Sequence, residues 1–282
     1  MEQFASGWKH HYYGKGDVIV YRLNRDAKPP SGQSAVFGAN VLMLTYGESF
    51  GPTYTTGDNT GLVATDSMKN FIQRETMNYA GDDLADYCRF LAATFLEKYP
   101  QAEGVQVSAS EIPYEGLGRG VAFVPGGPDR AFTRVELGRG GAIIEATSGL
   151  RGFRLLRLGG SSFVGFVRDE YTTLPEITNR PLHMWLDLEW RYTNPASGFA
   201  TGDVARVRQI VHDVFCSFES GSIQQVIHQM GSRILRERGD VAEVHLEANN
   251  RTWDTIVERG DELGIFTDAR PPYGCLGLTL KR

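Results

Sequence analysis

Apolar residues recur at helical spacing in two stretches of this chain. In residues 83–97 they stand at i, i+3, i+4, i+7 and i+11, at Leu84, Tyr87, Cys88, Leu91 and Phe95. The same spacing returns 139 residues later, at Ile223, Val226, Ile227, Met230 and Ile234. A single apolar stripe is typical of a helix that packs one face on a core. The pattern therefore predicts two equivalent amphipathic helices.

The offset of 139 residues extends to both sides of these helices without a gap. Upstream, a shorter apolar stripe at Met68, Phe71 and Ile72 corresponds to Val207, Ile210 and Val211. Downstream, a strand-like run with Val105 and Val107 corresponds to Val244 and Leu246. One ungapped register thus relates residues 68–107 to residues 207–246, and such self-similarity indicates a duplicated unit.

Strand-like segments, in which β-branched and aromatic residues alternate with polar ones, flank each helix pair. They cover residues 17–24, 35–46 and 132–137 in the first half, and residues 142–147, 153–158, 183–192 and 274–280 in the second. Each half reads strand, strand, helix, helix, strand, strand. This order predicts an α+β fold, in which helices cover one face of an antiparallel sheet. We expect two such domains, at residues 1–139 and 140–282.

The glycine-rich runs do not predict a nucleotide site. Residues 116–120 (GLGRG) and 138–141 (GRGG) do not match the pattern G-x-G-x-x-G. The second run lies between two strand-like segments, where it is typical of a hairpin turn. Strands and helices also do not alternate, so a doubly wound sheet is not expected.

Composition and charge narrow the classes of partner. The chain has 282 residues, of which 41% are hydrophobic and 22% charged, and a formal charge of -5. With this net negative charge, the chain has no overall positive potential that would attract nucleic acid or an anionic membrane. There is no uninterrupted apolar run of about 18 residues, no apolar signal segment near residue 1, and no peroxisomal tripeptide in the last residues, LTLKR. We expect a cytoplasmic protein without a nucleic-acid or membrane partner.

The cysteines and histidines show no metal-ligand spacing. The three cysteines, Cys88, Cys216 and Cys275, lie far apart, which fits a reducing compartment. No two of the six histidines stand at a spacing typical of metal ligands beside an acidic residue. The histidines are His10, His11, His183, His212, His228 and His245. We interpret them as ordinary surface or partly buried imidazoles, and expect no metal site.

Two candidate chemical residues lie in the first half. Lys15 sits in a glycine-flanked turn that enters a strand. It is either a solvated turn lysine or a lysine whose pKa is lowered by desolvation, so that it accepts a proton near neutral pH. Thr65, with Asp66 and Ser67, stands where the first helix of this half begins, and all three are N-cap candidates. A hydroxyl and free amides at a helix N-terminus also bind anionic or acceptor-rich ligands.

The second half adds Gln224, Arg180 and Phe163. Ser222 and Gln225 have capping-box spacing, which leaves Gln224 as a spare amide that is either solvated or available to a ligand. Arg180 is interpreted first as a surface arginine and Phe163 as a core aromatic. The internal register adds an asymmetry, because Thr65 corresponds to Val204 and Gln224 corresponds to Ala85. A specialised site in a duplicated fold would show such positions.

Several motifs together resemble the urate oxidase (uricase) family. They are Tyr13-Gly14-Lys15, VATDSxKN at residues 63–70, FxRDEYTTL at residues 166–174, Arg180, and Ser222-Ile223-Gln224. Their order and the tandem halves match the family along nearly the whole chain. The resemblance implies two tandem tunnelling-fold (T-fold) domains. It also implies a homotetramer in which the sheets form a barrel around a tunnel, with active sites between subunits.

The resemblance also implies an activity and a set of roles. The family converts urate to 5-hydroxyisourate in urate degradation and reduces dioxygen to hydrogen peroxide, without a metal or organic cofactor. Lys15 would accept a proton through the hydroxyl of Thr65. The implied substrate contacts are a clamp by Arg180 and Gln224, stacking by Phe163, and backbone groups near Asp66 and Ile223.

One segment departs from the commoner family pattern. Many urate oxidases carry Leu-Pro-Asn-x-His after the last long helix, whereas residues 246–253 here read LEANNRTW. Counting from Leu246, Asn249 falls on the family's asparagine, near the oxygen or water site, and Arg251 falls where the histidine is expected. Either Arg251 supplies positive charge without titrating, or the relay relies on Lys15 and Thr65 alone. Asn250 takes the place of Asn249 if the register shifts by one.

Two alternatives to a urate oxidase stay open. One is another T-fold enzyme that acts on purine or pterin rings. Pterin-handling relatives commonly anchor the heterocycle with a glutamate and some use zinc, so Gln224 and the lack of a Cys/His cluster disfavour them. The other is a tunnel-forming T-fold protein that binds purines without turnover. It would be favoured if Lys15 and Thr65 failed to meet across an interface.

Overall fold

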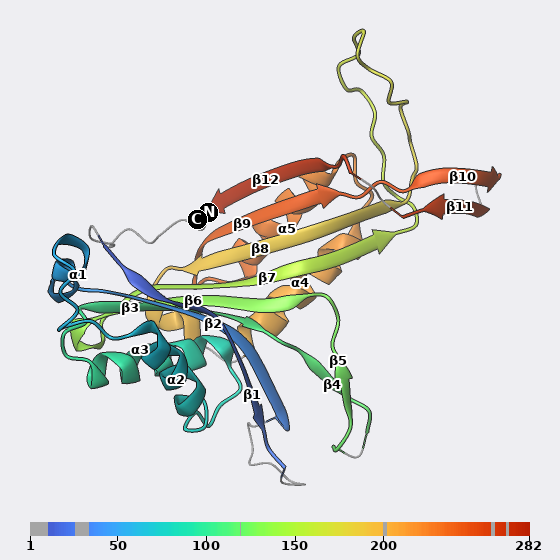
Figure 1. The fold of residues 1–282 in the computed structure, drawn as a ribbon. Coiled ribbons are helices and arrows are strands. Elements are labelled where there is room, and N and C mark those ends of the chain that lie inside the picture. The colour runs from blue at the N-terminus through green and yellow to red at the C-terminus, as the bar shows by residue number, and fades with distance from the viewer. Residues whose placement is uncertain (1–10, 26–33, 119, 200–201, 261–262, 269–270) are drawn as a thin grey trace. The chain divides into compact units, whose positions relative to one another are not determined.

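The computed structural model describes residues 11–25, 34–118, 120–199, 202–260, 263–268 and 271–282, so His10 lies outside the described residues. The chain divides into two compact units. Unit 1 comprises residues 1–149 and 191–201, and unit 2 comprises residues 150–190 and 202–282. Each unit combines antiparallel strands with a pair of helices (Figure 1).

Unit 1 is built on strands β1 (Tyr13–Leu23), β2 (Val36–Tyr46), β3 (Gly104–Glu111) and β6 (Arg130–Gly138). Each strand pairs antiparallel with the next in this order. Helices α2 (Thr65–Glu75) and α3 (Leu84–Lys98) lie on one face of these strands (Figure 1). A short helix, α1 (Gly51–Thr55), and a small hairpin, β4 (Tyr114–Gly116) with β5 (Phe123–Pro125), complete the unit.

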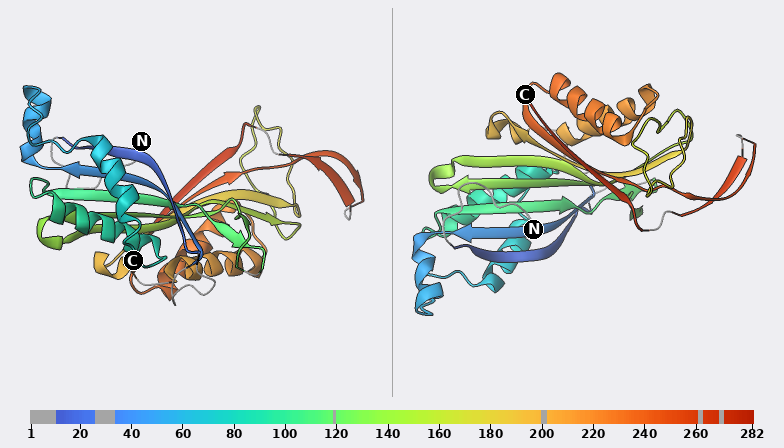
Figure 2. Two further views of the ribbon diagram at one scale, coloured as in Figure 1. Left: turned by 60° about the horizontal axis from the view of Figure 1, so that its bottom comes forward. Right: turned by 90° about the horizontal axis from the view of Figure 1, so that it is seen from above.

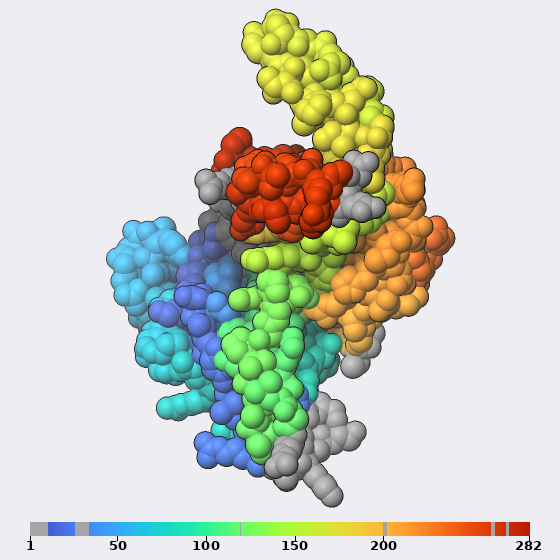
Figure 3. Space-filling view, turned by 90° about the vertical axis from the view of Figure 1, so that its right-hand side faces the viewer, coloured from blue at the N-terminus to red at the C-terminus, as the bar shows by residue number. Residues whose placement is uncertain are grey.

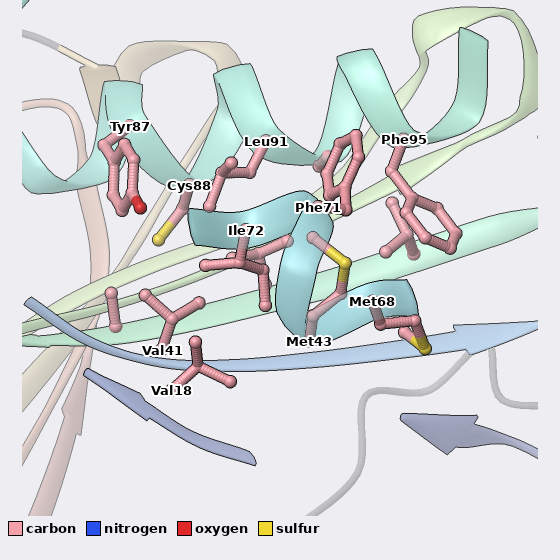
Figure 4. Close-up of a cluster of buried hydrophobic side chains, with 14 of the residues drawn as sticks. Val18, Val41, Met43, Met68, Phe71, Ile72, Tyr87, Cys88, Leu91 and Phe95 are labelled. Atoms are coloured by element: carbon pink, nitrogen blue, oxygen red, sulfur yellow. The ribbon is translucent and has the colours of Figure 1, made fainter. Parts of the chain in front are cut away.

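The apolar stripes of α2 and α3 form the core of unit 1 against the strands (Figure 4). Ile72, Cys88 and Leu91 are fully buried and lie over Val41 and Met43 of β2. Burial of one such aliphatic side chain contributes about 1.5–3 kcal/mol. Burial of the apolar stripe that the sequence predicts therefore holds α3 on the sheet.

Unit 2 contains most of β7 (Ile143–Arg157) and β8 (Leu182–Tyr192), with β9 (Val241–Asn250) and β12 (Gly274–Lys281). Helices α4 (Asp203–Ser217) and α5 (Ile223–Glu237) lie together on one side of these strands (Figure 2). A second hairpin, β10 (Asp254–Arg259) with β11 (Leu263–Thr267), follows β9. Among the described residues, hydrogen-bonded neighbours give one strand order, β1-β2-β3-β6-β7-β8-β9-β12.

The predicted α+β fold and its element order are confirmed. Helices α3 and α5 begin at Leu84 and Ile223 and end at Lys98 and Glu237, so both ends obey the offset of 139 residues. The glycine run at 138–141 is a hairpin turn between β6 and β7, with Gly140 and Gly141 at φ +80°. The domain boundary between residues 139 and 140 stays a prediction.

Three local expectations were wrong. Residues 142–147 and 153–158 belong to one strand, β7, because a glycine at φ +74°, Gly152, continues the strand instead of ending it. The N-cap of α2 is Ala64, and Thr65 is the first helical residue. Lys15 lies in β1 beside a β-bulge, not in a turn, since β1 pairs with β2 from Tyr13 onward.

Candidate active site

A cavity of about 480 Å³ lies within unit 2. Its walls come from the segment between β7 and β8, the start of β8, the N-terminus of α5, the end of β9, the hairpin β10–β11 and the start of β12. Four predicted substrate-binding residues line it, Phe163, Arg180, Ile223 and Gln224. The structure therefore brings together residues that lie up to 61 positions apart in the sequence.

The segment between β7 and β8 is tied at its base and extends away from the strands of unit 2 (yellow in Figure 3). The Gly160 N–H donates to Asn179 Oδ1 at 2.7 Å, and the Arg180 N–H donates to the Ser161 carbonyl at 2.9 Å. These bonds join the two ends of the segment. They fix Arg180 at the cavity although it lies outside any strand or helix.

Arg180 has the character of an anion-binding group. Its side chain is half-buried, and its Nε is buried without a hydrogen-bond partner among the described residues. Burial lowers the pKa of Arg180, and no carboxylate contributes to that shift. A buried guanidinium without a carboxylate is costly unless a ligand satisfies its donors.

Phe163 lies on the cavity wall rather than in the core. Its N–H and carbonyl pair with Ile177 across the base of the protruding segment, at 2.8 and 3.2 Å. The ring stacks on Phe166, with centroids 4.9 Å apart and planes at 14°. The Arg180 guanidinium carbon lies 5.8 Å from the Phe163 centroid. The aromatic ring and the cation thus border the same space.

The N-terminus of α5 has the predicted Ser222 cap, but the Gln225 side chain bonds to Gly221 instead of Ser222. Ser222 Oγ accepts the Gln225 N–H at 3.1 Å, and Gln225 Oε1 accepts the Gly221 N–H at 2.8 Å. Gln224 takes no part in this cap, and its exposed amide lines the cavity. The capping residues therefore hold the helix while the amide between them faces the cavity.

The end of β9 and the residues after it show which asparagine reaches the cavity. Asn250 and Thr252 line it, and the Thr252 hydroxyl donates to Asn250 Oδ1 at 3.2 Å. Asn249 is not among the lining residues, and its Oδ1 accepts from the Cys275 thiol at 3.9 Å. Adjacent strand residues point to opposite faces, so only one of the two asparagines faces the cavity.

Arg251 is held outside the cavity lining. Its guanidinium carbon lies 4.0 Å from the Trp185 centroid and 3.8 Å from the Tyr273 centroid. Its N–H donates to the His183 carbonyl at 3.0 Å. A cation placed between two aromatic rings is attracted to both ring faces. Arg251, at the position where the family's histidine is expected, therefore stacks on aromatic rings and does not face the cavity.

Lys15, Thr65 and Asp66 lie in unit 1. The Tyr13 hydroxyl accepts the Val63 N–H at 2.9 Å, which joins the strand that carries Lys15 to the segment that precedes Thr65. The charge of Lys15 is one of the causes that lower the pKa of Asp66, after a hydrogen bond and the charge of Lys69. Lys15 and the start of α2 therefore lie near one another.

Thr65 is exposed, and no hydrogen bond engages its hydroxyl among the residues that the structure describes. The Asp66 carboxylate accepts from Lys69 Nζ at 2.6 Å and Asn70 Nδ2 at 2.9 Å. Because Asp66 bonds within its own helix, its backbone N–H at the start of α2 is the group left for a ligand.

Sequence reasoning missed His183 and Trp253, which both line the cavity. The position of His183, three residues after Arg180, was the available signal. Within the described part of the chain, no three His, Cys, Asp or Glu residues gather as metal ligands, and no helix is long and apolar enough to cross a membrane.

The comparisons with known proteins all point to one family. The family model described as Uricase matches residues 11–136 and 146–274. The chain is 38% identical to a uric acid degradation bifunctional protein of Bacillus sp. TB-90, over 93% of this chain and 58% of that protein. It therefore spans less than two thirds of that relative. It is also 38% identical to the uricase of Haloferax volcanii, over 96% of this chain and 97% of that protein.

The fold agrees with these matches. The crystal structure of urate oxidase from Bacillus sp. TB-90 superposes with a TM-score of 0.86 at 37% identity, covering 96% of this chain and 100% of that one. The first matched range contains the Lys15 segment, and the second contains Phe163, Arg180 and Gln224 of the cavity. The chain belongs to the uricase family.

Proposed function

We propose that this protein is a urate oxidase, which converts urate, dioxygen and water to 5-hydroxyisourate and hydrogen peroxide without a metal or organic cofactor. The observation that carries the proposal is Arg180, a half-buried guanidinium in a cavity, with no carboxylate acting on it and an unpartnered Nε. Membership of the uricase family supplies the reaction.

The cavity chemistry fits urate. Urate is a flat anion near neutral pH, and its edges alternate N–H and C=O groups. A guanidinium fork supplies two parallel donors to such an edge, and the Gln224 amide supplies one acceptor and two donors. The Phe163 ring offers an apolar surface for the purine face. We propose Arg180 and Gln224 as the clamp and Phe163 as the stacking residue.

Backbone groups at helix starts would complete the recognition of the ring. The first N–H groups of a helix have no partner within it. At the start of α5 these belong to Ile223 and Gln224, and at the start of α2 they include Asp66. The macrodipole of each helix favours a negative ligand at that end.

Lys15 and Thr65 would form the proton relay. The Lys15 amine accepts a ring N–H proton of the urate monoanion through the Thr65 hydroxyl. The resulting dianion is rich in electrons and can transfer two of them to dioxygen. The proton held by Lys15 then returns to the reduced oxygen, which becomes hydroperoxide.

We propose that the working molecule is a cytoplasmic homotetramer of tandem T-fold domains, residues 1–139 and 140–282, with sites between subunits. Strands β1 and β12 each have a single neighbour in the sheet of the described residues. Open edges of this kind can pair with another chain and close a barrel. Lys15 and Arg180 also belong to separate units of the chain, which fits a site assembled from two subunits.

The decisive experiment is turnover by protein that has been dialysed against a chelator. Urate should lose its ultraviolet absorbance while oxygen is consumed in equal amount. Purine binding without turnover would contradict the enzyme proposal and favour the non-catalytic alternative. Turnover that requires added metal would contradict the cofactor-free mechanism and leave the substrate assignment standing.

A further inference from the structure

Among the described residues that line the cavity, His183 is the one whose side chain ordinarily titrates near neutral pH. The other titratable lining residues are Arg180 and Glu258, whose ordinary pKa values lie far from neutrality. Glu258 is exposed on β10, whereas His183 is half-buried at the start of β8. A group that exchanges protons near neutrality inside this cavity is therefore His183.

The His183 ring is held in place by its neighbours. Its centroid lies 5.1 Å from that of Trp253, and Trp253 in turn lies 6.0 Å from Phe266 of β11. The His183 carbonyl accepts the Arg251 N–H at 3.0 Å, which fixes the backbone at this point. A proton acceptor needs such a fixed position relative to its ligand.

The surroundings of His183 favour its neutral form. Desolvation by burial is the largest cause that lowers its pKa, and the charges of Arg154 on β7 and Arg251 after β9 add to it. The carboxylate of Asp268 after β11 and the interaction of the His183 ring with the Arg251 backbone act in the opposite direction. His183 Nδ1 is buried without a partner among the described residues, so an N–H there would have no acceptor. A neutral imidazole has one nitrogen free to accept a proton.

We propose that His183 is the base that activates the water which hydroxylates the oxidised purine. This inference rests on the proposed function and assigns a step that Lys15 and Thr65 leave uncovered. Asn250 and Thr252, on the same cavity wall, offer the polar groups that a bound water needs. Arg251 does not take this role, because its guanidinium is stacked between Trp185 and Tyr273 and has no acceptor atom for a proton.

One turnover begins with electron transfer from the ring to dioxygen. The urate dianion gives two electrons to dioxygen, and the proton from Lys15 makes hydroperoxide. Water then adds its oxygen to the oxidised ring while His183 takes one water proton and becomes imidazolium. The imidazolium gives this proton to hydroperoxide. The products are hydrogen peroxide and the 5-hydroxyisourate anion, and His183 is neutral again.

The test compares His183→Gln with a matched control, His228→Gln, in which an exposed histidine on α5 is replaced. General-base removal costs about 10²–10⁴-fold, so kcat should fall by at least about 10²-fold in His183→Gln and stay at the wild-type value in His228→Gln. The kcat profile of the wild type should lose activity as pH falls through a pKa below 6.5. This acid limb should be absent from His183→Gln.

Two further measurements keep the inference testable if that variant folds poorly. Added imidazole should restore a part of the kcat of His183→Ala. In the wild type, the ring resonance of His183 should shift when urate is added without oxygen, whereas that of His228 should not. A wild-type enzyme that oxidises urate while His183→Gln keeps its kcat and its acid limb overturns the inference alone. A wild type that does not oxidise urate overturns the proposed function instead.

Discussion

At the scale of single residues, Arg180 and the Gln224 amide carry the functional argument. Most arginines of unit 2 have partners, such as Arg157, whose terminal nitrogens donate to the Phe218 and Gly160 carbonyls at 2.7 and 3.0 Å. Arg180 differs because its guanidinium is half-buried and no carboxylate acts on it. The difference is one of environment and not of residue type, so in the sequence only the family motif, and no property of the arginine itself, singled out Arg180.

Replacement of Arg180 tests the clamp. In Arg180→Ala the KM for urate should rise by about 10–100-fold with a smaller change in kcat, because hydrogen bonds to a charged group contribute about 1.5–3 kcal/mol. Arg180→Lys should recover little, because an ammonium cannot form the planar fork. The control is Arg168→Ala, which removes an exposed arginine of the same segment. An unchanged KM in Arg180→Ala would mean that the clamp assignment is wrong.

Tyr13→Phe tests the link between the Lys15 strand and the Thr65 segment. The variant keeps the edge contact with Phe50 but leaves the Val63 N–H without its acceptor, which should lower the free energy of unfolding by about 1–2 kcal/mol. It should also lower kcat, because Lys15 and Thr65 lose their common anchor.

The difference in unfolding free energy between the wild type and Tyr13→Phe should depend on pH. Burial raises the pKa of Tyr13 from 10.0 to about 12, so its protonated form is favoured in the folded state. Its contribution to stability is complete below pH 10 and is lost as pH rises toward about 12. Urea unfolding at pH 8 and pH 11 should therefore show a smaller gap between wild type and variant at pH 11. An equal gap at both values, or an equal effect of Tyr114→Phe, contradicts this account.

At the scale of elements, the spacing of apolar residues predicted the helices and strands better than the polar residues did. The stripes of α3 and α5 specified both helices and their equivalence, since burial of one face dictates the period. Strand β7 was not predictable as one strand, because Ser148, Gly149 and Gly152 suggest a turn and only pairing with a neighbour shows otherwise. The small hairpin β10–β11 has exposed apolar residues on both faces, including Ile256 and Val257, so no alternation marked it.

The cap of α5 links an element to the site, and Ser222→Ala tests it. Loss of an N-cap side chain costs about 1 kcal/mol, so the free energy of unfolding should fall by that amount. The matched control is Asp83→Ala, which removes the equivalent cap of α3, where Asp83 Oδ1 accepts the Asp86 N–H at 2.9 Å. Both variants should lose similar stability, but only Ser222→Ala should raise the KM for urate, because α5 carries Gln224. A raised KM in both would point to a general loss of structure.

At the scale of the whole molecule, one chain is an incomplete enzyme if its sites lie between subunits. The clamp candidates Arg180 and Gln224 lie in unit 2, and the relay candidates Lys15 and Thr65 lie in unit 1. Spacing and motifs located all four residues, but no pattern within one sequence states whether they meet within a chain or between chains. That question depends on assembly, which the open edges of β1 and β12 permit.

Mixed assembly of two inactive variants answers it. Lys15→Met should lack the proton acceptor and Arg180→Ala should lack the clamp at low urate concentration, so each alone should have little activity. If each site joins Lys15 of one subunit to Arg180 of another, random assembly of equal amounts of the two chains should leave about one quarter of the sites intact. The chains are best produced together with different affinity tags, and doubly tagged oligomers isolated for assay at low urate concentration. Sites contained within one chain would show no recovery, because every chain then carries one defect. Recovery to about a quarter of the wild-type rate per site, with none in a mixture of the separately assembled variants, would establish that the subunits share their sites.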